Sequence, residues 1–180
     1  MSDFETAIPT ILRHEGKFEQ NAADPGGVTN YGISLRWLKA QGLLENLELQ
    51  DRTQDEVQVV KDLTVDAATA LYKSYFWNPY NYGAIDSQLV ATKIFDVTVN
   101  MGARRSHLIV QNCLGFPPEQ RDGVMGPKTI AEINAAGAAP LVVQIQSVQA
   151  AFYRQLVATN PKLQPFLQGW LNRYFDRNLT

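Results

Sequence analysis

Apolar residues recur at helical spacing along most of this 180-residue chain. Phe4, Ile8, Ile11 and Leu12 illustrate the pattern, because residues three and four apart lie on one face of an α-helix. Small polar residues precede several of these runs and can cap the first turn of a helix. The pattern predicts a mainly α fold, with helices over residues 3–14, 34–42, 54–63, 64–75, 87–100, 103–114 and 139–158, one starting at Pro127 and one after residue 161, and with Asp3, Ser34, Thr64 and Ser87 as caps.

Proline and glycine mark the expected interruptions of these helices. Pro9 lies inside the first helix, where it lacks an amide hydrogen, so we expect a kink or a later start. Gly42 is expected to end the second helix. Gly102 is expected to break or kink the helix over residues 87–100. The last helix carries an apolar stripe that we expect to be core: Phe166, Trp170, Leu171 and Tyr174.

Residues 16–33 depart from the helical pattern. Four glycines and one proline in this stretch argue against a regular helix, so a loop with a small hairpin is expected. Glu15 closes the apolar helical segment before the loop, and the loop carries Asp24, Thr29 and Asn30. A carboxyl at the end of an apolar helix can be partly desolvated, and desolvation favours the protonated form that a general acid needs. The stretch is therefore suited to line a catalytic cleft, although most such runs are simply turns.

Two further groups of residues have both a packing and a binding interpretation. Tyr80 and Tyr82 belong to the densest aromatic cluster and could form a wall on which sugars stack, whereas Phe76 and Trp77 are expected in the core. Asp96 and Asn100 share a helix face because they are four residues apart, and they either fix helix packing or line the cleft.

Composition and charge exclude several classes. The formal net charge of −2 gives weak attraction to nucleic acid, so no nucleic-acid partner is expected. A single cysteine, Cys113, excludes an intramolecular disulfide and fits folding in a reducing compartment. His14 and His107 are too few for a three-histidine zinc site, and the sequence has no phosphate loop or dinucleotide fingerprint. We therefore expect no metal and no cofactor.

The N-terminal half carries a specific resemblance. Glu15-Gly16, followed by the run from Asp24 to Ile33 (Asp-Pro-Gly-Gly-Val-Thr-Asn-Tyr-Gly-Ile), resembles the signature of glycoside hydrolase family 108, the phage endolysin and secretion-activator muramidases. Lys17 stands where that family usually has a second glycine, which changes the backbone and the charge beside the acid. The resemblance implies a lysozyme-like helical fold.

The C-terminal half resembles that family's predicted peptidoglycan-binding segment. Phe95 to Gly102 is similar to its Phe-Asp-x-x-Val-Asn-x-Gly element, and Asp122 to Thr129 is similar to the Asp-Gly-x-x-Gly-Pro-x-Thr repeat of peptidoglycan-binding domains. We expect a muramidase region over residues 1–90 and a helical peptidoglycan-binding-like region over residues 91–180, packed together as one compact unit.

The resemblance implies cleavage of the β-1,4 bond between N-acetylmuramic acid and N-acetylglucosamine. We assign Glu15 as general acid, Asp24 as the carboxylate that activates water, and Thr29 as the group that orients it, with Asn30 as the alternative. A separation of the two carboxyls of about 6.5–9.5 Å would make the enzyme inverting. The residues expected to bind substrate are Phe18, Asn30, Tyr31, Tyr80, Asp96 and Asn100.

Two other functions fit the same sequence. A lytic transglycosylase also uses one glutamate but leaves an anhydro-muramic end, and a non-catalytic secretion accessory would only bind peptidoglycan. The N-terminus has neither the basic nor the apolar region of a Sec signal. We expect a monomer made in the cytoplasm that acts in the periplasm or cell wall and gets there with a holin-like or inner-membrane export partner.

Overall fold

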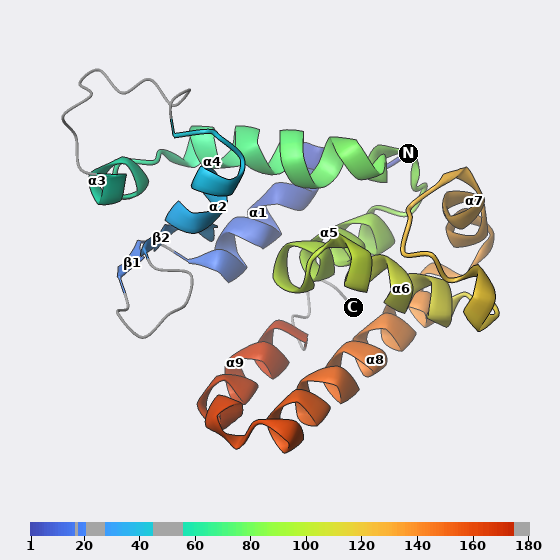
Figure 1. Cartoon of the computed structure of the whole chain (residues 1–180). Coiled ribbons are helices and arrows are strands. Elements are labelled where there is room, and N and C mark those ends of the chain that lie inside the picture. Colours follow the sequence, from blue (N-terminus) through green and yellow to red (C-terminus); the bar gives the residue numbers. More distant parts are fainter. Residues whose placement is uncertain (17, 21–27, 45–55, 175–180) are drawn as a thin grey trace. The chain divides into compact units, whose positions relative to one another are not determined.

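The computed structural model describes residues 1–16, 18–20, 28–44 and 56–174. Their backbone is mostly helical and includes a small antiparallel sheet (Figure 1), which confirms the predicted mainly α class. The helices are α1 (Phe4–Glu15), α2 (Leu35–Ala40), α3 (Glu56–Lys61), α4 (Val65–Tyr72), α5 (Gln88–Met101), α6 (Ala103–Cys113), α7 (Pro127–Ala135), α8 (Ala138–Thr159) and α9 (Gln164–Tyr174). The strands are β1 (Glu19–Gln20), β2 (Val28–Asn30) and β3 (Ile33–Ser34), and short π or 3-10 turns cover Lys73–Trp77, Asn78–Tyr80, Tyr82–Ala84, Pro118–Gln120 and Pro161–Leu163.

The four predicted helix caps are confirmed. Each small polar side chain accepts a hydrogen bond from the backbone amide three residues later, which satisfies a donor that the first helical turn leaves unpaired. The donor–acceptor distances are 2.9 Å from Thr6 N to Asp3, 3.1 Å from Trp37 N to Ser34, 3.1 Å from Ala67 N to Thr64 and 3.4 Å from Val90 N to Ser87.

Glycine ends two helices as predicted. Gly42 has a φ of +64°, and the amide of Leu43 donates to the carbonyl of Leu38 at 3.0 Å, the pattern of a Schellman motif. Gly102, with a φ of +81°, separates α5 from α6. Pro9, in contrast, does not delay the first helix, which starts at Phe4. Its side chain is exposed, so the helical carbonyl that loses its amide partner lies on the solvent side.

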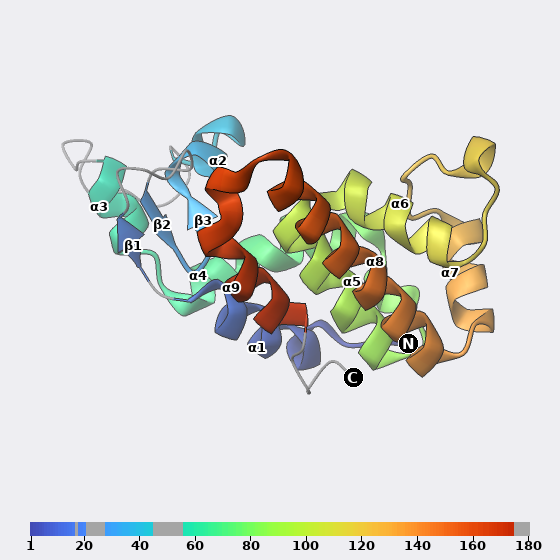
Figure 2. The same ribbon diagram turned by 90° about the horizontal axis from the view of Figure 1, so that it is seen from below.

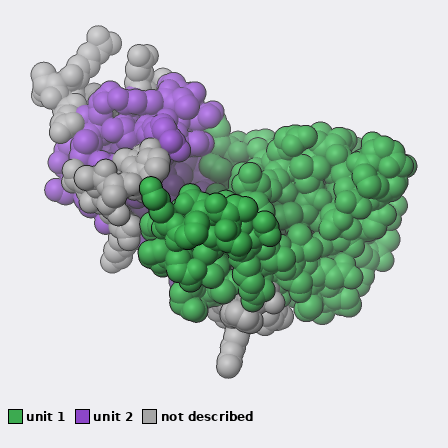
Figure 3. Space-filling model, turned by 60° about the horizontal axis from the view of Figure 1, so that its bottom comes forward, with its two compact units in different colours: residues 1–10, 73–180 green, residues 11–72 purple. Residues whose placement is uncertain are grey.

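Contacts within the chain group into two compact units (Figure 3). One unit is residues 11–72, and the other joins residues 1–10 to residues 73–180. The boundary expected at residue 90, between the muramidase region and the peptidoglycan-binding-like region, comes from sequence resemblance and not from contacts. It stays a prediction.

In the unit of residues 1–10 and 73–180, α5 packs against α6 and α8, and α8 packs against α9 (Figure 2). The side chains of α5 are buried from Val90 to Thr98. Aromatic rings pack beside this helix, with Trp77 and Phe95 in edge contact at 5.3 Å between centroids. Trp77 is 4% exposed, so its predicted core position is confirmed.

The predicted core stripe on the last helix is wrong for Phe166, whose side chain is 54% exposed. Trp170 and Leu171 are only half-buried. The reason is that α9 packs mainly along α8 and the turn that joins them, so a partner covers only part of its apolar face. The spacing of apolar residues predicts the helix correctly but says nothing about how many neighbours it has.

In the unit of residues 11–72, the sheet has the order β1-β2-β3 with antiparallel pairing. Thr29 on β2 lies opposite Glu19 of β1 and Ser34 of β3, and Asn30 lies opposite Ile33. α3 packs against β2, and α2 follows β3 directly. Among the residues that the structure describes, no helix is both long and apolar enough to cross a bilayer.

Candidate active site

Glu15 is the last residue of α1, and its side chain is half-buried. Ile11, one turn earlier on the helix, is fully buried and anchors this end of α1. Gly16 follows with a φ of +72°, and its amide still donates to the carbonyl of Leu12 at 3.3 Å. The sequence therefore stops the helix at the glutamate, because a left-handed glycine cannot continue it.

The β2–β3 hairpin turns through two residues, Tyr31 and Gly32, which we call the Tyr31–Gly32 turn. Both residues have positive φ, +50° for Tyr31 and +76° for Gly32. Two-residue hairpin loops with positive φ at both positions match the twist of the flanking strands. Glycine adopts this conformation freely, whereas a tyrosine does so at a conformational cost.

Gly32 lies directly against the carboxyl of Glu15. A Cβ atom added to Gly32 would lie 2.5 Å from Glu15 Oε2 and 2.7 Å from Glu15 Cγ. It would also lie 2.6 Å from the hydroxyl oxygen of Tyr72. Because real Cβ atoms do not approach other atoms this closely, only glycine leaves room for both side chains. The hairpin thus provides the surface against which the carboxyl rests.

Tyr72, the last residue of α4, fixes this turn from the other side. Its side chain is 1% exposed, and its hydroxyl donates a hydrogen bond to the carbonyl oxygen of Tyr31 at 2.8 Å. Glu15, the Tyr31–Gly32 turn and Tyr72 therefore form one contiguous group within residues 11–72.

Asn30 has a role that the sequence prediction did not include. It is 5% exposed, and its side-chain amide nitrogen lies 3.1 Å from the carbonyl of Val60, 3.0 Å from that of Lys61 and 3.2 Å from that of Leu63. Val60 and Lys61 are the last two residues of α3, and Leu63 follows the helix. Carbonyls at a helix end lack the amide partner of a regular turn, and that of Val60 also accepts from the amide of Leu63 at 3.3 Å. This nitrogen therefore ties the strand to α3, and the choice between Thr29 and Asn30 as the group that orients water stays a prediction.

The remaining predicted residues of this half have different positions. Thr29 is half-exposed on β2, on the opposite face of the strand from Val28 and Asn30. Phe18 and Tyr31 are half-buried. Asp24 lies outside the residues that the structure describes, so its role as a catalytic carboxylate stays a prediction.

Tyr80, Asp96 and Asn100 belong to the other unit. Tyr80 is half-buried and makes an edge contact with the ring of His107 at 4.9 Å between centroids. The role of Tyr80 in sugar stacking stays a prediction, whereas Tyr82 is fully buried and packs in the core instead.

Asp96 and Asn100 connect α5 to the C-terminal helices. Asp96 is fully buried; its Oδ1 accepts from Arg173 Nε of α9 at 2.8 Å, and its Oδ2 lies 3.7 Å from Lys93 Nζ. Asn100 Oδ1 accepts a hydrogen bond from the hydroxyl of Tyr153 on α8. These contacts support the packing interpretation of the pair, and their predicted contact with substrate is untested.

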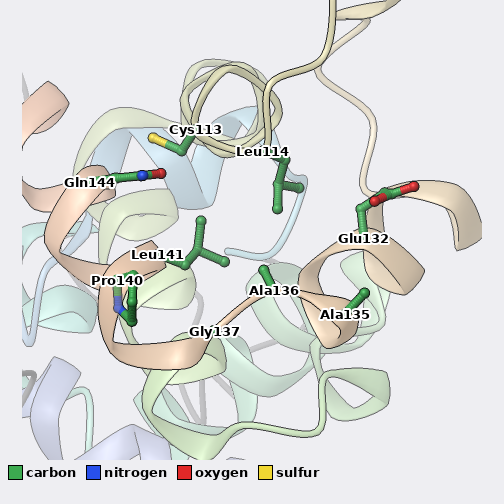
Figure 4. A pocket seen from close by; sticks show the side chains of 9 residues that line it. All are labelled: Cys113, Leu114, Glu132, Ala135, Ala136, Gly137, Pro140, Leu141 and Gln144. Carbon is green, nitrogen blue, oxygen red and sulfur yellow. The ribbon is translucent and has the colours of Figure 1, made fainter.

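A pocket of about 300 Å³ lies between the end of α6, the end of α7 and the start of α8 (Figure 4). Cys113, Glu132 and Leu141 are among its lining residues, and none of the predicted site residues is. Burial raises the pKa of the Cys113 thiol to about 11, so this cysteine is protonated at neutral pH and is not a nucleophile. Within the described part of the chain, no three His, Cys, Asp or Glu residues are grouped as metal ligands would be.

Sequence reasoning missed Tyr72 as part of the site. A tyrosine on an apolar helix face normally indicates packing, and nothing near position 72 points to Glu15. The glycines of residues 16–33 predicted a hairpin, but they did not predict its turn, because Tyr-Gly is not one of the residue pairs typical of a two-residue hairpin loop.

Comparison with known families gives the class of the protein. Residues 8–102 match the family described as Glycosyl hydrolase 108, and residues 105–175 match one described as Predicted Peptidoglycan domain. A helical fold with a glutamate at a helix end beside a small hairpin, joined to such a domain, defines a lysozyme-like enzyme that hydrolyses peptidoglycan.

More particularly, the chain belongs to the Glycosyl hydrolase 108 family, whose match spans more than half of it. The predicted family resemblance is thus confirmed for both halves. The element from Phe95 to Gly102, which resembles the start of the peptidoglycan-binding segment, falls inside the glycosyl hydrolase match instead.

Solved structures include similar chains. The structure described as Brucella abortus SagA is 26% identical in sequence, with a TM-score of 0.74 over 95% of this chain and 88% of that one. No curated protein matches the chain.

Proposed function

We propose that this protein is an N-acetylmuramidase that hydrolyses the β-1,4 bond between N-acetylmuramic acid and N-acetylglucosamine, with Glu15 as general acid. The observation that carries the proposal is the position of Glu15, a half-buried residue that ends α1 and whose carboxyl rests against Gly32. Glycoside hydrolysis needs a carboxyl that protonates the leaving oxygen while the sugar develops oxocarbenium character. A carboxyl held against the backbone of a turn is positioned for that step.

The second step is the attack of water on the anomeric carbon. We assign the activation of this water to Asp24 and its orientation to Thr29. The side chain of Thr29 is half-exposed on β2, the strand that leads into the Tyr31–Gly32 turn. The mechanism that we propose uses these protein groups without a metal or a cofactor. Peptidoglycan lies outside the inner membrane, so the enzyme would act in the periplasm or cell wall, and a holin-like or inner-membrane export partner stays a prediction.

The test is a digest of purified peptidoglycan by the wild type and by Glu15→Gln. Losing a general acid typically costs a factor of about 10²–10⁴ in rate. The variant should fold as the wild type does, because glutamine keeps the shape of the side chain, and should release products at least about 100 times more slowly. Product masses identify the bond: reducing muramic ends support the hydrolase, whereas anhydro-muramic ends indicate a lytic transglycosylase.

The matched control is Glu19→Gln, which makes the same chemical change at the nearest rival carboxyl four residues later. This variant should keep its activity. A Glu15→Gln enzyme as fast as the wild type would remove Glu15 from the mechanism, and loss of activity only in Glu19→Gln would transfer the role to that residue.

A further inference from the structure

Tyr72 has a position that packing alone does not explain. The ring is buried at the end of α4, yet its hydroxyl reaches the carbonyl oxygen of Tyr31, 41 residues earlier in the chain. That carbonyl belongs to the peptide unit that joins Tyr31 to Gly32. The hydrogen bond therefore restrains the plane of this peptide, which is the connection inside the Tyr31–Gly32 turn.

Gly32 links this restraint to Glu15. Glu15 Oε2 and the Tyr72 hydroxyl oxygen both lie within 2.6 Å of the same point, the position that a Cβ of Gly32 would occupy. The Cα of Gly32 is thus the surface that the carboxyl contacts, and it is bonded to the peptide that Tyr72 holds. Any rotation of that peptide moves the surface under the carboxyl.

The backbone conformation of the turn makes such a restraint necessary. Tyr31 has a φ of +50°, in the left-handed region that non-glycine residues seldom occupy. A residue in this region persists only where surrounding contacts hold it. The hydrogen bond from Tyr72 is such a contact, and its donor lies beside the carboxyl itself.

We propose that Tyr72 is a positioning residue for Glu15: it holds the Tyr31–Gly32 turn in the conformation that places the carboxyl for proton transfer. The inference rests on the proposed role of Glu15 as general acid. Tyr72 acts through Glu15 and takes no proton in the reaction. Its effect is geometric, and misplacing a catalytic group by about 1 Å can cost about 100-fold in rate.

The experiment measures kcat and KM for peptidoglycan hydrolysis by Tyr72→Phe, which keeps the buried ring and removes only the hydroxyl. We expect kcat to fall roughly 10- to 100-fold with KM little changed, because the substrate contacts are intact and the acid is misplaced. A merely structural role would lower the melting temperature and leave kcat of the folded enzyme unchanged. All assays are therefore run well below the melting temperature of each variant.

Tyr82→Phe is the matched control. Tyr82 is another fully buried tyrosine, in the other unit, and its hydroxyl contacts Thr98 at 2.6 Å and His107 at 2.8 Å. Removing it should lower stability without changing kcat. Equal losses of kcat in Tyr72→Phe and Tyr82→Phe would show that the effect is general destabilisation and would overturn the proposal.

The double variant Glu15→Gln/Tyr72→Phe separates this proposal from the proposed function. If Tyr72 acts through Glu15, the double variant is no slower than Glu15→Gln alone, whereas independent effects would multiply. Two outcomes would overturn the role of Tyr72 and leave the proposed function intact. One is a double variant in which the two losses of rate multiply. The other is a Tyr72→Phe enzyme with the wild-type kcat while Glu15→Gln is inactive. A fully active Glu15→Gln enzyme would instead overturn the proposed function.

Discussion

Hydrogen bonds determine which nitrogen of the His107 ring carries the hydrogen and how His107 and Tyr82 are connected. Nδ1 of His107 lies 3.0 Å from the carbonyl oxygen of Gly123, which can only accept, so Nδ1 carries the hydrogen. In the neutral ring Nε2 is then an acceptor for the Tyr82 hydroxyl, 2.8 Å away. The histidine is 2% exposed, so its ring packs in the interior.

Stability should depend on pH through His107. Burial lowers the pKa of His107 because it penalises the charged ring, although the Gly123 carbonyl and Asp122 act in the opposite direction. As the pH falls below the ordinary value of 6.5, the unfolded chain takes up this proton before the folded chain does. The stabilising contribution is therefore complete above about pH 6.5 and declines as the pH falls toward the lowered pKa.

Urea unfolding of the wild type and His107→Gln at pH 8 and pH 5.5 measures this contribution. The wild type should lose more free energy of unfolding than the variant between the two pH values, because glutamine does not titrate. Tyr80, Tyr82 and Asp122 are ionisable side chains beside the ring, and the substitution at position 107 leaves all three in place. Equal losses in the two proteins would show that His107 does not set the pH dependence.

At the scale of elements, the side-chain amide of Asn30 connects α3 to the β2–β3 hairpin. α3 has only six residues, so it cannot be stable without tertiary contacts, and Asn30 satisfies carbonyls at its end. The same residue begins the turn against which Glu15 rests. Loss of this amide should therefore affect both the sheet and the helix.

Asn30→Ala should reduce the free energy of unfolding by about 1–3 kcal/mol, the cost of leaving buried carbonyls without donors. Asn30→Asp should be worse, because it keeps the shape of the side chain but directs a carboxylate at three carbonyl oxygens. Equilibrium unfolding in urea gives both values. Asn112→Asp makes the same chemical change at an exposed site and should stay within about 0.5 kcal/mol of the wild type; if Asn30→Asp matches it, the amide bonds are unimportant.

Local signals explain which elements could be predicted. The caps at Asp3, Ser34, Thr64 and Ser87 depend on residues three positions apart, and all four were correct. The contact of Tyr72 with Tyr31 spans 41 residues and has no local signature. The exposure of Phe166 depends on which helices lie beside α9, and the spacing along one helix does not contain that information.

At the scale of the whole molecule, the two family matches cover different segments of the chain. Residue 15 falls in the glycosyl hydrolase match, and residues 105–175 form the match to the peptidoglycan domain. The contact units follow other boundaries, since residues 73–102 group with the C-terminal segment. Sequence resemblance therefore predicts which segments carry which activity, whereas the packing of residues 73–102 had to be read from the structure.

The Glu15→Gln protein should still bind insoluble peptidoglycan, because the substitution lies outside the peptidoglycan-domain match. Cosedimentation with purified wall sacculi measures this, and insoluble cellulose serves as an unrelated glycan that should not retain the protein. The inactive variant also leaves the sacculi intact during the experiment. Recovery of the variant entirely in the supernatant would show that binding requires the intact acid.

Tyr31 occupies a position that an asparagine or a glycine would fill at lower conformational energy. A left-handed tyrosine costs about 1–2 kcal/mol relative to an ordinary backbone geometry. Relief of such a cost is one way in which a substitution can raise stability at the expense of function. Replacing Tyr31 by glycine or asparagine would relieve this cost and would also remove an aromatic ring beside Gly32 that we predict to bind substrate.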